Sequence, residues 1–166
     1  MNRIEASQIL KKHTNKLNRS KFNYFQLNTG YSCVLTKPLV GYKNVYTSGN
    51  SRTGIRREAI VKLLIPAGAR VIIGRDNSII INKYKNDGTV ISVEMLKLRT
   101  DKAKVLSILS INNKPCKSGY SGHDSSFIYS VNRIVTPKRG FNRSYNTCAG
   151  GIHFYLTRKE AERYHR

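Results

Sequence analysis

Cys148 and His153 are the first residues whose types and spacing suggest chemistry, because they flank a Gly-Gly pair in the stretch CAGGIHFYLTRKEAERY, residues 148–164. A thiol beside an imidazole can form a nucleophile and its base, and both groups bind zinc. A catalytic dyad also needs a group that orients the imidazole, and the stretch offers no Asn or Asp. Zinc needs about four Cys or His ligands in close pairs, whereas the other candidates stand alone: Cys33, Cys116, His123. We therefore expect no catalytic residue, no metal site and no cofactor.

The rest of the sequence carries no stronger catalytic signature. It contains neither GxxxxGK(S/T) nor a GxGxxG that leads into a helix, so no phosphate-cradling loop is indicated. The carboxylates lie on separate predicted elements and form no acid pair: Glu58, Asp76, Glu94, Asp101, Asp124. We therefore predict that the protein is not an enzyme.

Positive charge is the dominant property of the chain, with 30 Lys and Arg against 9 Asp and Glu and a formal net charge of +21. Two stretches contain no acidic residue, between Glu5 and Glu58 and from Ser125 to Lys159. Such a chain attracts polyanions, and the aromatic residues interleaved with its cations suit stacking on exposed bases. We predict non-sequence-specific binding of nucleic acid through phosphate contacts. The expected contact residues lie in these two stretches: Lys11, Lys12, Lys16, Arg19, Lys21, Arg52, Arg56, Arg57, Lys138, Arg139, Arg143.

The elements that would carry these residues are mostly strands. Residues 2–18 have apolar side chains at roughly helical spacing, which indicates a basic amphipathic helix. The apolar runs AIVKLLI and ARVII are strand-like and are separated by Pro66, which cannot donate to a sheet ladder. Asn86-Asp87-Gly88 indicates a hairpin turn between two further strands.

The C-terminal stretch predicts a strand followed by a helix. IHFYL, residues 152–156, alternates so that His153 lies half-buried on the face opposite to its apolar neighbours. Thr157 and Glu160 have the spacing of a capping box, which predicts a short terminal helix. The expected fold class is α+β, a mainly antiparallel sheet or open barrel of about seven or eight strands with an N-terminal basic helix and a short C-terminal helix.

Length and composition indicate one folded domain over residues 22–166, preceded by a basic N-terminal extension over residues 1–21. The three cysteines include no CxxC pair, and we expect reduced thiols in an intracellular protein. No apolar run is long enough for a signal sequence or for a transmembrane segment.

The segments REAIVKLLIPAGARV, DKAKVLSI, SSFIYSVNRIV and CAGGIHFYLTRKEAERY resemble a domain of unknown function in proteins of giant nucleocytoplasmic DNA viruses and some other microbes. The resemblance covers about residues 31–165 and is most specific in a final C-x-x-G-I-H-F-F-x-T-x-x-E-A-x-x-Y motif, from which Tyr155 departs conservatively. It implies a viral origin and transfers no activity. The residues that fit this motif are Cys148, Gly151, Ile152, His153, Phe154, Thr157, Glu160, Ala161 and Tyr164.

Three functional hypotheses follow, and the leading one is a basic protein that condenses or anchors the genome in the virion or in the viral factory of the host cytoplasm. The second is a capsid-associated cement protein whose basic face contacts acidic viral structural proteins. The third rests on a faint similarity of VYTSGN and LLIPAGARV to ADP-ribosyltransferases, which bind nicotinamide dinucleotide. Glu94 would then replace the E-x-E carboxylate of that family, in an active enzyme or an inactive relative. The sequence leaves the oligomeric state open.

Overall fold

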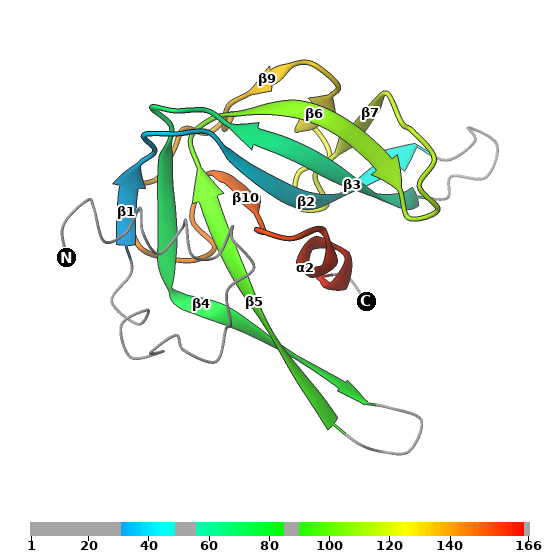
Figure 1. The fold of residues 1–166 in the computed structure, drawn as a ribbon, viewed down its shortest axis with the longest axis horizontal. Helices are drawn as coiled ribbons and strands as arrows, with labels where there is room; N and C mark the ends of the chain where they lie inside the picture. Colours follow the sequence, from blue (N-terminus) through cyan, green and yellow to red (C-terminus); the bar gives the residue numbers. More distant parts are fainter. Residues whose placement is uncertain (1–30, 49–55, 85–89, 165–166) are drawn as a thin grey trace.

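Ten strands and one short helix make up the part of the chain that the structure, a computed structural model, describes: residues 31–48, 56–84 and 90–164, without the side chains of 31, 48, 75–84 and 90–96. Figure 1 shows their arrangement. The strands are β1 (Tyr31–Val34), β2 (Leu39–Ser48), β3 (Arg56–Ile65), β4 (Arg70–Tyr84), β5 (Val90–Thr100), β6 (Ala103–Ser110), β7 (Ser118–Tyr120), β8 (Ile128–Ser130), β9 (Ile134–Val135) and β10 (Ile152–Phe154), and the helix is α2 (Arg158–Arg163).

The strands form two antiparallel sheets, one in the order β1-β4-β5-β10 and one in the order β8-β7-β2-β3-β6-β9. The prediction of an α+β fold is therefore wrong, because the described residues are mostly β and α2 has only six residues, too few to form a layer. The predicted N-terminal helix lies outside the described residues. Residues 118–135 contain three short strands, β7, β8 and β9, of which β8 and β9 lie in the stretch FIYSVNRIV, residues 127–135, whose alternation indicates a strand.

A sharp corner at Pro66 carries the chain from one sheet to the other, since β3 belongs to the six-stranded sheet and β4 to the four-stranded one. Gly68 adopts a positive φ of 78° in this turn, which a residue without a Cβ reaches readily. The Gly68 N–H donates to the Leu35 carbonyl at 2.8 Å, and the Leu35 N–H donates to Ala69 at 2.9 Å. The predicted break at Pro66 is confirmed. The predicted hairpin is also confirmed by the β4–β5 pairing through Tyr84 and Val90.

The hydrophobic core lies between the two sheets. Alternate residues of the strands point into it, among them Val45 of β2, Leu63 of β3, Leu98 of β5 and Phe154 of β10, all fully buried. Gly41 of β2 makes room for the Phe154 ring, since a Cβ at position 41 would lie 2.4 Å from a ring carbon. Burial of each such side chain stabilises the fold by about 1.5–3 kcal/mol.

A backbone bridge joins the sheets a second time, where Tyr42 of β2 and Tyr155 after β10 exchange two hydrogen bonds of 2.8 and 2.7 Å. The helix α2 then packs against β2 and β3, as Figure 1 shows, where Ala161 joins a small cluster with Ile60 and Tyr155.

The predicted capping box of α2 is confirmed. The Thr157 hydroxyl accepts from the Glu160 N–H at 3.3 Å, and the Glu160 carboxylate accepts from the Thr157 N–H at 3.0 Å. The cap fixes the direction in which the chain leaves β10, and so places the C-cap residue Tyr164.

Candidate functional site: a lysine-lined cavity

A cavity of about 500 Å³ opens where several strands, the end of α2 and two loops meet, and we call it the lysine cavity. β2 and β5 contribute Lys43 and Lys97, β10 contributes His153, and Tyr164 follows α2. The loops before β8 and before β10 supply the remaining walls, the latter through residues 137–140 and 148–151. This volume lies in the usual range of small-ligand sites, about 300–1,000 Å³.

Lys43 is a buried cation that forms no ion pair with a described residue. It lies on the core-facing side of β2 between Gly41 and Val45, and only 9% of its surface is exposed. Among the described residues no group accepts a hydrogen bond from its ammonium, and the nearest aromatic contact is the Tyr129 ring centroid at 6.0 Å. Burial, helped by repulsion from Lys97, lowers the pKa of Lys43 to about 8. Lys43 is therefore mostly charged at neutral pH, in a site that disfavours its charge.

Lys97 is the second buried cation of the cavity, with 6% of its surface exposed. Its Nζ lies 3.4 Å from the Tyr164 hydroxyl, 3.9 Å from the Cys148 sulfur and 5.2 Å from the Tyr164 ring centroid. These contacts orient the ammonium and give it a cation–π interaction. No carboxylate among the described residues pairs with it.

Two neutral histidines complete the basic cluster. His153 donates from Nε2 to the Thr147 carbonyl at 3.0 Å, which leaves Nδ1 unprotonated. Burial, followed by the charges of Lys43 and Lys97, lowers the pKa of His153 to about 3. His123, whose Nε2 lies 3.2 Å from the Tyr164 hydroxyl, also has a lowered pKa, first through burial and then through the same two lysines. The two lysine charges thus act on both histidines, and no described carboxylate forms an ion pair with either lysine.

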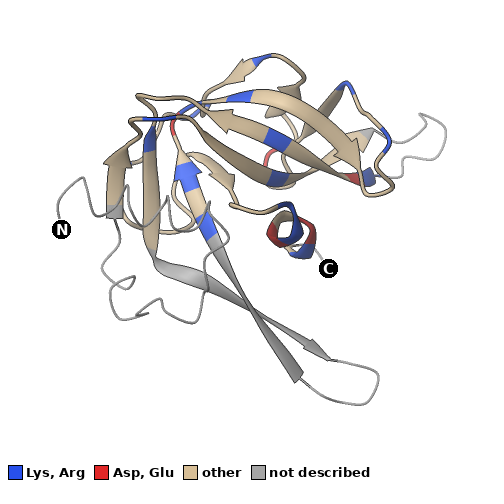
Figure 2. Cartoon of the chain, viewed as in Figure 1, with Lys and Arg blue, Asp and Glu red and all other residues tan. Residues whose placement is uncertain are grey.

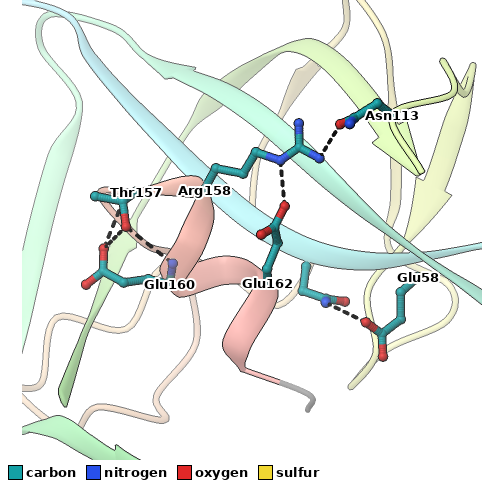
Figure 3. A network of polar contacts seen from close by, with 7 residues as sticks. Glu58, Asn113, Thr157, Arg158, Glu160 and Glu162 are labelled. Atoms are coloured by element: carbon teal, nitrogen blue, oxygen red, sulfur yellow. Dashed lines mark hydrogen bonds and ion pairs between the residues drawn. The ribbon is translucent and has the colours of Figure 1, made fainter. Parts of the chain in front are cut away.

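The acids of α2 are engaged by neighbouring polar side chains, as Figure 3 shows. Glu160 is held by Thr157 in the capping box, with the Thr157 hydroxyl 2.6 Å from its carboxylate. Glu162 accepts from Arg158 Nε at 2.7 Å, and the same guanidinium donates to the Asn113 side-chain oxygen. Neither carboxylate lines the lysine cavity.

Asp124 is the acid that lines the cavity, and it is at the rim. Its carboxylate accepts from the Ser126 hydroxyl at 2.6 Å and from the Ser126 N–H at 3.0 Å. This hydrogen bonding, with the nearby charges of Lys138 and Arg139, lowers the pKa of Asp124. Lys138 also donates to the Ser126 carbonyl, so the two loops are tied at the mouth. The other acidic side chains described lie away from the lining: Glu58 and Asp101.

Arg99 of β5 shapes the wall formed by the loop before β10. It is 1% exposed, and its guanidinium donates to three loop carbonyls: those of Asn142 at 2.9 Å, Gly150 at 2.9 Å and Ser144 at 2.5 Å. The Phe141 ring lies 5.8 Å from the guanidinium carbon. Arg99 thus holds residues 142–150 in a fixed curve, which positions residues 148–151 at the cavity.

The structure separates the predicted nucleic-acid contacts into three groups. Lys138 and Arg139 line the lysine cavity, and Arg143 is exposed on the same loop. Arg56 and Arg57 are exposed at the start of β3 and do not line the cavity. Figure 2 shows Lys and Arg spread over both sheets, whereas Asp and Glu are few. The remaining predicted contacts lie outside the described residues: Lys11, Lys12, Lys16, Arg19, Lys21, Arg52.

Sequence reasoning missed Lys43 and Lys97. A signal existed for Lys43, because alternation in β2 places it on the same face as Leu39 and Val45. The sequence carried no such signal for Lys97, because it lies on the opposite face to Leu98 and becomes buried only through the loop before β10 and the end of α2.

Cys148 and His153 both line the cavity but form no dyad. Cys148 contacts Lys97, while His153 donates to Thr147, and the half-buried strand position predicted for His153 is confirmed.

All three cysteines are free. Within the described ranges no three His, Cys, Asp or Glu side chains gather as metal ligands. No described helix has the length and apolarity needed to cross a membrane. The Glu94 side chain lies outside the described residues.

Comparison with known proteins places the chain among viral relatives. An uncharacterized protein, L223, of Acanthamoeba polyphaga mimivirus is 32% identical over 165 residues, a match that covers 89% of this chain and 97% of L223. This relative supports the expected viral origin. No solved structure matches the chain. A family of unknown function, DUF5758, matches residues 29–161, and the chain therefore belongs to this family.

Proposed function

We propose that this protein is a non-enzymatic nucleic-acid-binding protein whose lysine cavity accepts phosphate. The observation that carries the proposal is the burial of Lys43 and Lys97 in one cavity without an acidic partner among the described residues. Removing an ion from water has a free-energy cost of several kcal/mol unless a counter-charge is present. An anion that enters the cavity provides that counter-charge to both ammonium groups at once.

The surface around the cavity supports a polyanion rather than an isolated small anion. Lys138 and Arg139 stand at the rim, Arg143 follows on the same loop, and the whole chain carries a net charge of +21. Phosphate contacts of this kind carry no sequence information and release counterions. With a giant-virus protein as a relative, the role we propose is condensing or anchoring the genome in the virion or the viral factory.

The test is a set of binding curves measured by fluorescence anisotropy with a short duplex and a single strand. We expect binding at low salt and a loss of about 10³-fold or more between 50 and 200 mM salt, as for a protein that makes six or more phosphate contacts. Lys43→Met should weaken binding, because it removes a phosphate partner inside the cavity. Lys62→Met is the matched control, since Lys62 of β3 is exposed and outside the cavity lining.

Two outcomes would contradict the proposal. The absence of binding at low salt would exclude nucleic acid as the partner. Equal weakening by Lys43→Met and Lys62→Met would mean that only the overall charge matters. Efficient displacement of the nucleic acid by polyglutamate would instead favour an acidic protein partner, such as a capsid subunit, because carboxylates would then satisfy the site as well as phosphates do.

A further inference from the structure

Two buried lysines bring positive charge to the lysine cavity. Lys43 and Lys97 are 9% and 6% exposed, and burial, followed by repulsion from Lys97, lowers the pKa of Lys43. The pKa values of the exposed His123 and the half-buried His153 are lowered, so these histidines are neutral and add no charge at neutral pH. Lys43 and Lys97 therefore present two positive charges to the cavity, and a ligand with a single negative charge leaves one of them without a partner.

The wall of the cavity is joined across two loops. Lys138 of the loop before β10, a lining residue, donates to the Ser126 carbonyl of the loop before β8.

From the two lysine charges that line one cavity, we infer that the lysine cavity selects a phosphomonoester, the terminal phosphate of a nucleotide or of a nucleic-acid strand, over an internal phosphodiester. The inference rests on the proposed function, in that the same cavity receives the phosphate. A phosphomonoester carries about −1.5 to −2 charges at pH 7 and three acceptor oxygens. It can therefore accept from Lys43 and Lys97 together, whereas a phosphodiester carries one charge.

The experiment compares strands of one sequence that differ only in their ends. Each strand is labelled on an internal base and carries at its 5′ or 3′ terminus a phosphate, the methyl ester of that phosphate, or a hydroxyl. The methyl ester keeps the size of the phosphate but removes its second charge. At one fixed salt concentration we expect the phosphate-terminated strand to bind roughly tenfold or more tightly than the other two.

Substitutions of the two lysines test whether the preference for a terminal phosphate arises in the cavity. Lys43→Met should abolish the preference, and Lys97→Met provides a second variant in case one of them folds poorly, which a thermal melt would reveal. Lys62→Met should keep the preference, because Lys62 is exposed and lies outside the lining. Competition with a nucleoside monophosphate distinguishes the two sources of a phosphomonoester, a free nucleotide and the end of a strand. Displacement at similar affinity indicates a free nucleotide, and failure to displace indicates a strand end.

The outcomes separate this inference from the proposed function. Equal affinity for all three ends, with binding of strands retained, overturns the inference and leaves the proposed function standing. Binding of the monophosphate, lost in Lys43→Met, without binding of any strand overturns the proposed function and supports the phosphomonoester site. Binding of neither overturns both.

Discussion

Arg99 and Lys43 are both buried cations without an acidic partner among the described residues, but their surroundings differ. The Arg99 guanidinium donates to three carbonyls of the loop before β10. The Lys43 ammonium has no hydrogen-bond acceptor among the described residues and lines the cavity. The protein itself solvates the first charge but not the second. Arg99 therefore serves the fold, and in the proposed function Lys43 serves binding.

The chemistry of the two side chains fits the different roles of Arg99 and Lys43. A guanidinium presents five donors in a rigid plane, so one Arg can hold several carbonyls of an irregular loop in fixed directions. An ammonium is a compact charge on a flexible stem whose pKa changes readily on burial. Lys43 can therefore turn toward a ligand, whereas a turn of Arg99 would break three hydrogen bonds at once.

The strongest test of the comparison is Arg99→Met. We expect it to lower the free energy of unfolding by about 3–5 kcal/mol, because hydrogen bonds to a charged group contribute about 1.5–3 kcal/mol each and buried carbonyls lose their donor. Urea unfolding at pH 7 measures the change. Arg143→Met, an exposed change on the same loop, should alter stability by about 0.5 kcal/mol at most. A loss below about 1 kcal/mol for Arg99→Met would mean that the loop does not depend on this charge.

Lys43→Met should act in the opposite direction and stabilise the protein without ligand. Burial lowers the pKa of Lys43 from 10.5 to about 8, so below pH 8 the folded state carries a penalty of about 3 kcal/mol that the Met variant lacks. Between pH 8 and 10.5 the unfolded chain binds the proton that the folded chain has released. The stability of the unmodified protein therefore rises with pH, and the advantage of the variant disappears over this window.

The measurement is the difference in unfolding free energy between the two proteins at pH 7 and pH 10. The other charged and titratable side chains of the lining are the same in both proteins, which is why the difference between the two is measured: Lys97, His123, Asp124, Tyr129, Lys138, Arg139, Cys148, His153, Tyr164. A variant that is less stable than the unmodified protein at pH 7 would show that the Lys43 charge is satisfied within the fold, and the contrast with Arg99 would fail.

His153 lies between the two regions, opposite Arg99 in the β5–β10 register and on the wall of the lysine cavity. Its pKa falls from 6.5 to about 3 on folding, so the unfolded chain alone binds a proton between these values and stability falls as pH drops through this window. At pH 5 this loss is about 2 kcal/mol. His153→Gln should remove it, and thermal melts at pH 7 and pH 5 measure the change. An unchanged pH 5 loss would contradict the buried neutral imidazole.

Local sequence signals predicted the elements better than their assembly. The Pro66 corner, the β4–β5 hairpin and the Thr157–Glu160 capping box are confirmed because each depends on a few neighbouring residues. The division into two sheets was missed, because it depends on pairs that are distant in sequence, such as β10 with β5 and β2 with β7. The fold class was wrong because the described residues are mostly β and the six-residue α2 forms no layer.

The candidate site was only partly accessible from sequence. The excess of positive charge indicated a set of exposed lysines and arginines as contacts. Two of these, Lys138 and Arg139, line the cavity. Alternation could have flagged Lys43 as a charged residue on an apolar face. The burial of Lys97 and Arg99 could not have been foreseen, because their strand face is covered by an irregular loop whose path Arg99 itself determines.

Thr157→Ala has the smallest expected effect. It tests whether the loop held by Arg99 and the wall of the lysine cavity are independent of each other. The change removes the hydroxyl that caps α2, and loss of such a cap lowers stability by about 1 kcal/mol. The helix end carries Tyr164, whose hydroxyl lies 3.4 Å from Lys97, so the change loosens the wall beside the lysines. The Arg99 hydrogen bonds do not involve α2 and should persist. Hydrogen exchange should therefore speed up over residues 158–164 and stay unchanged over 142–150. Faster exchange in both segments would show that the loop and the helix form one cooperative wall, and that the structural charge and the binding charge are not separable.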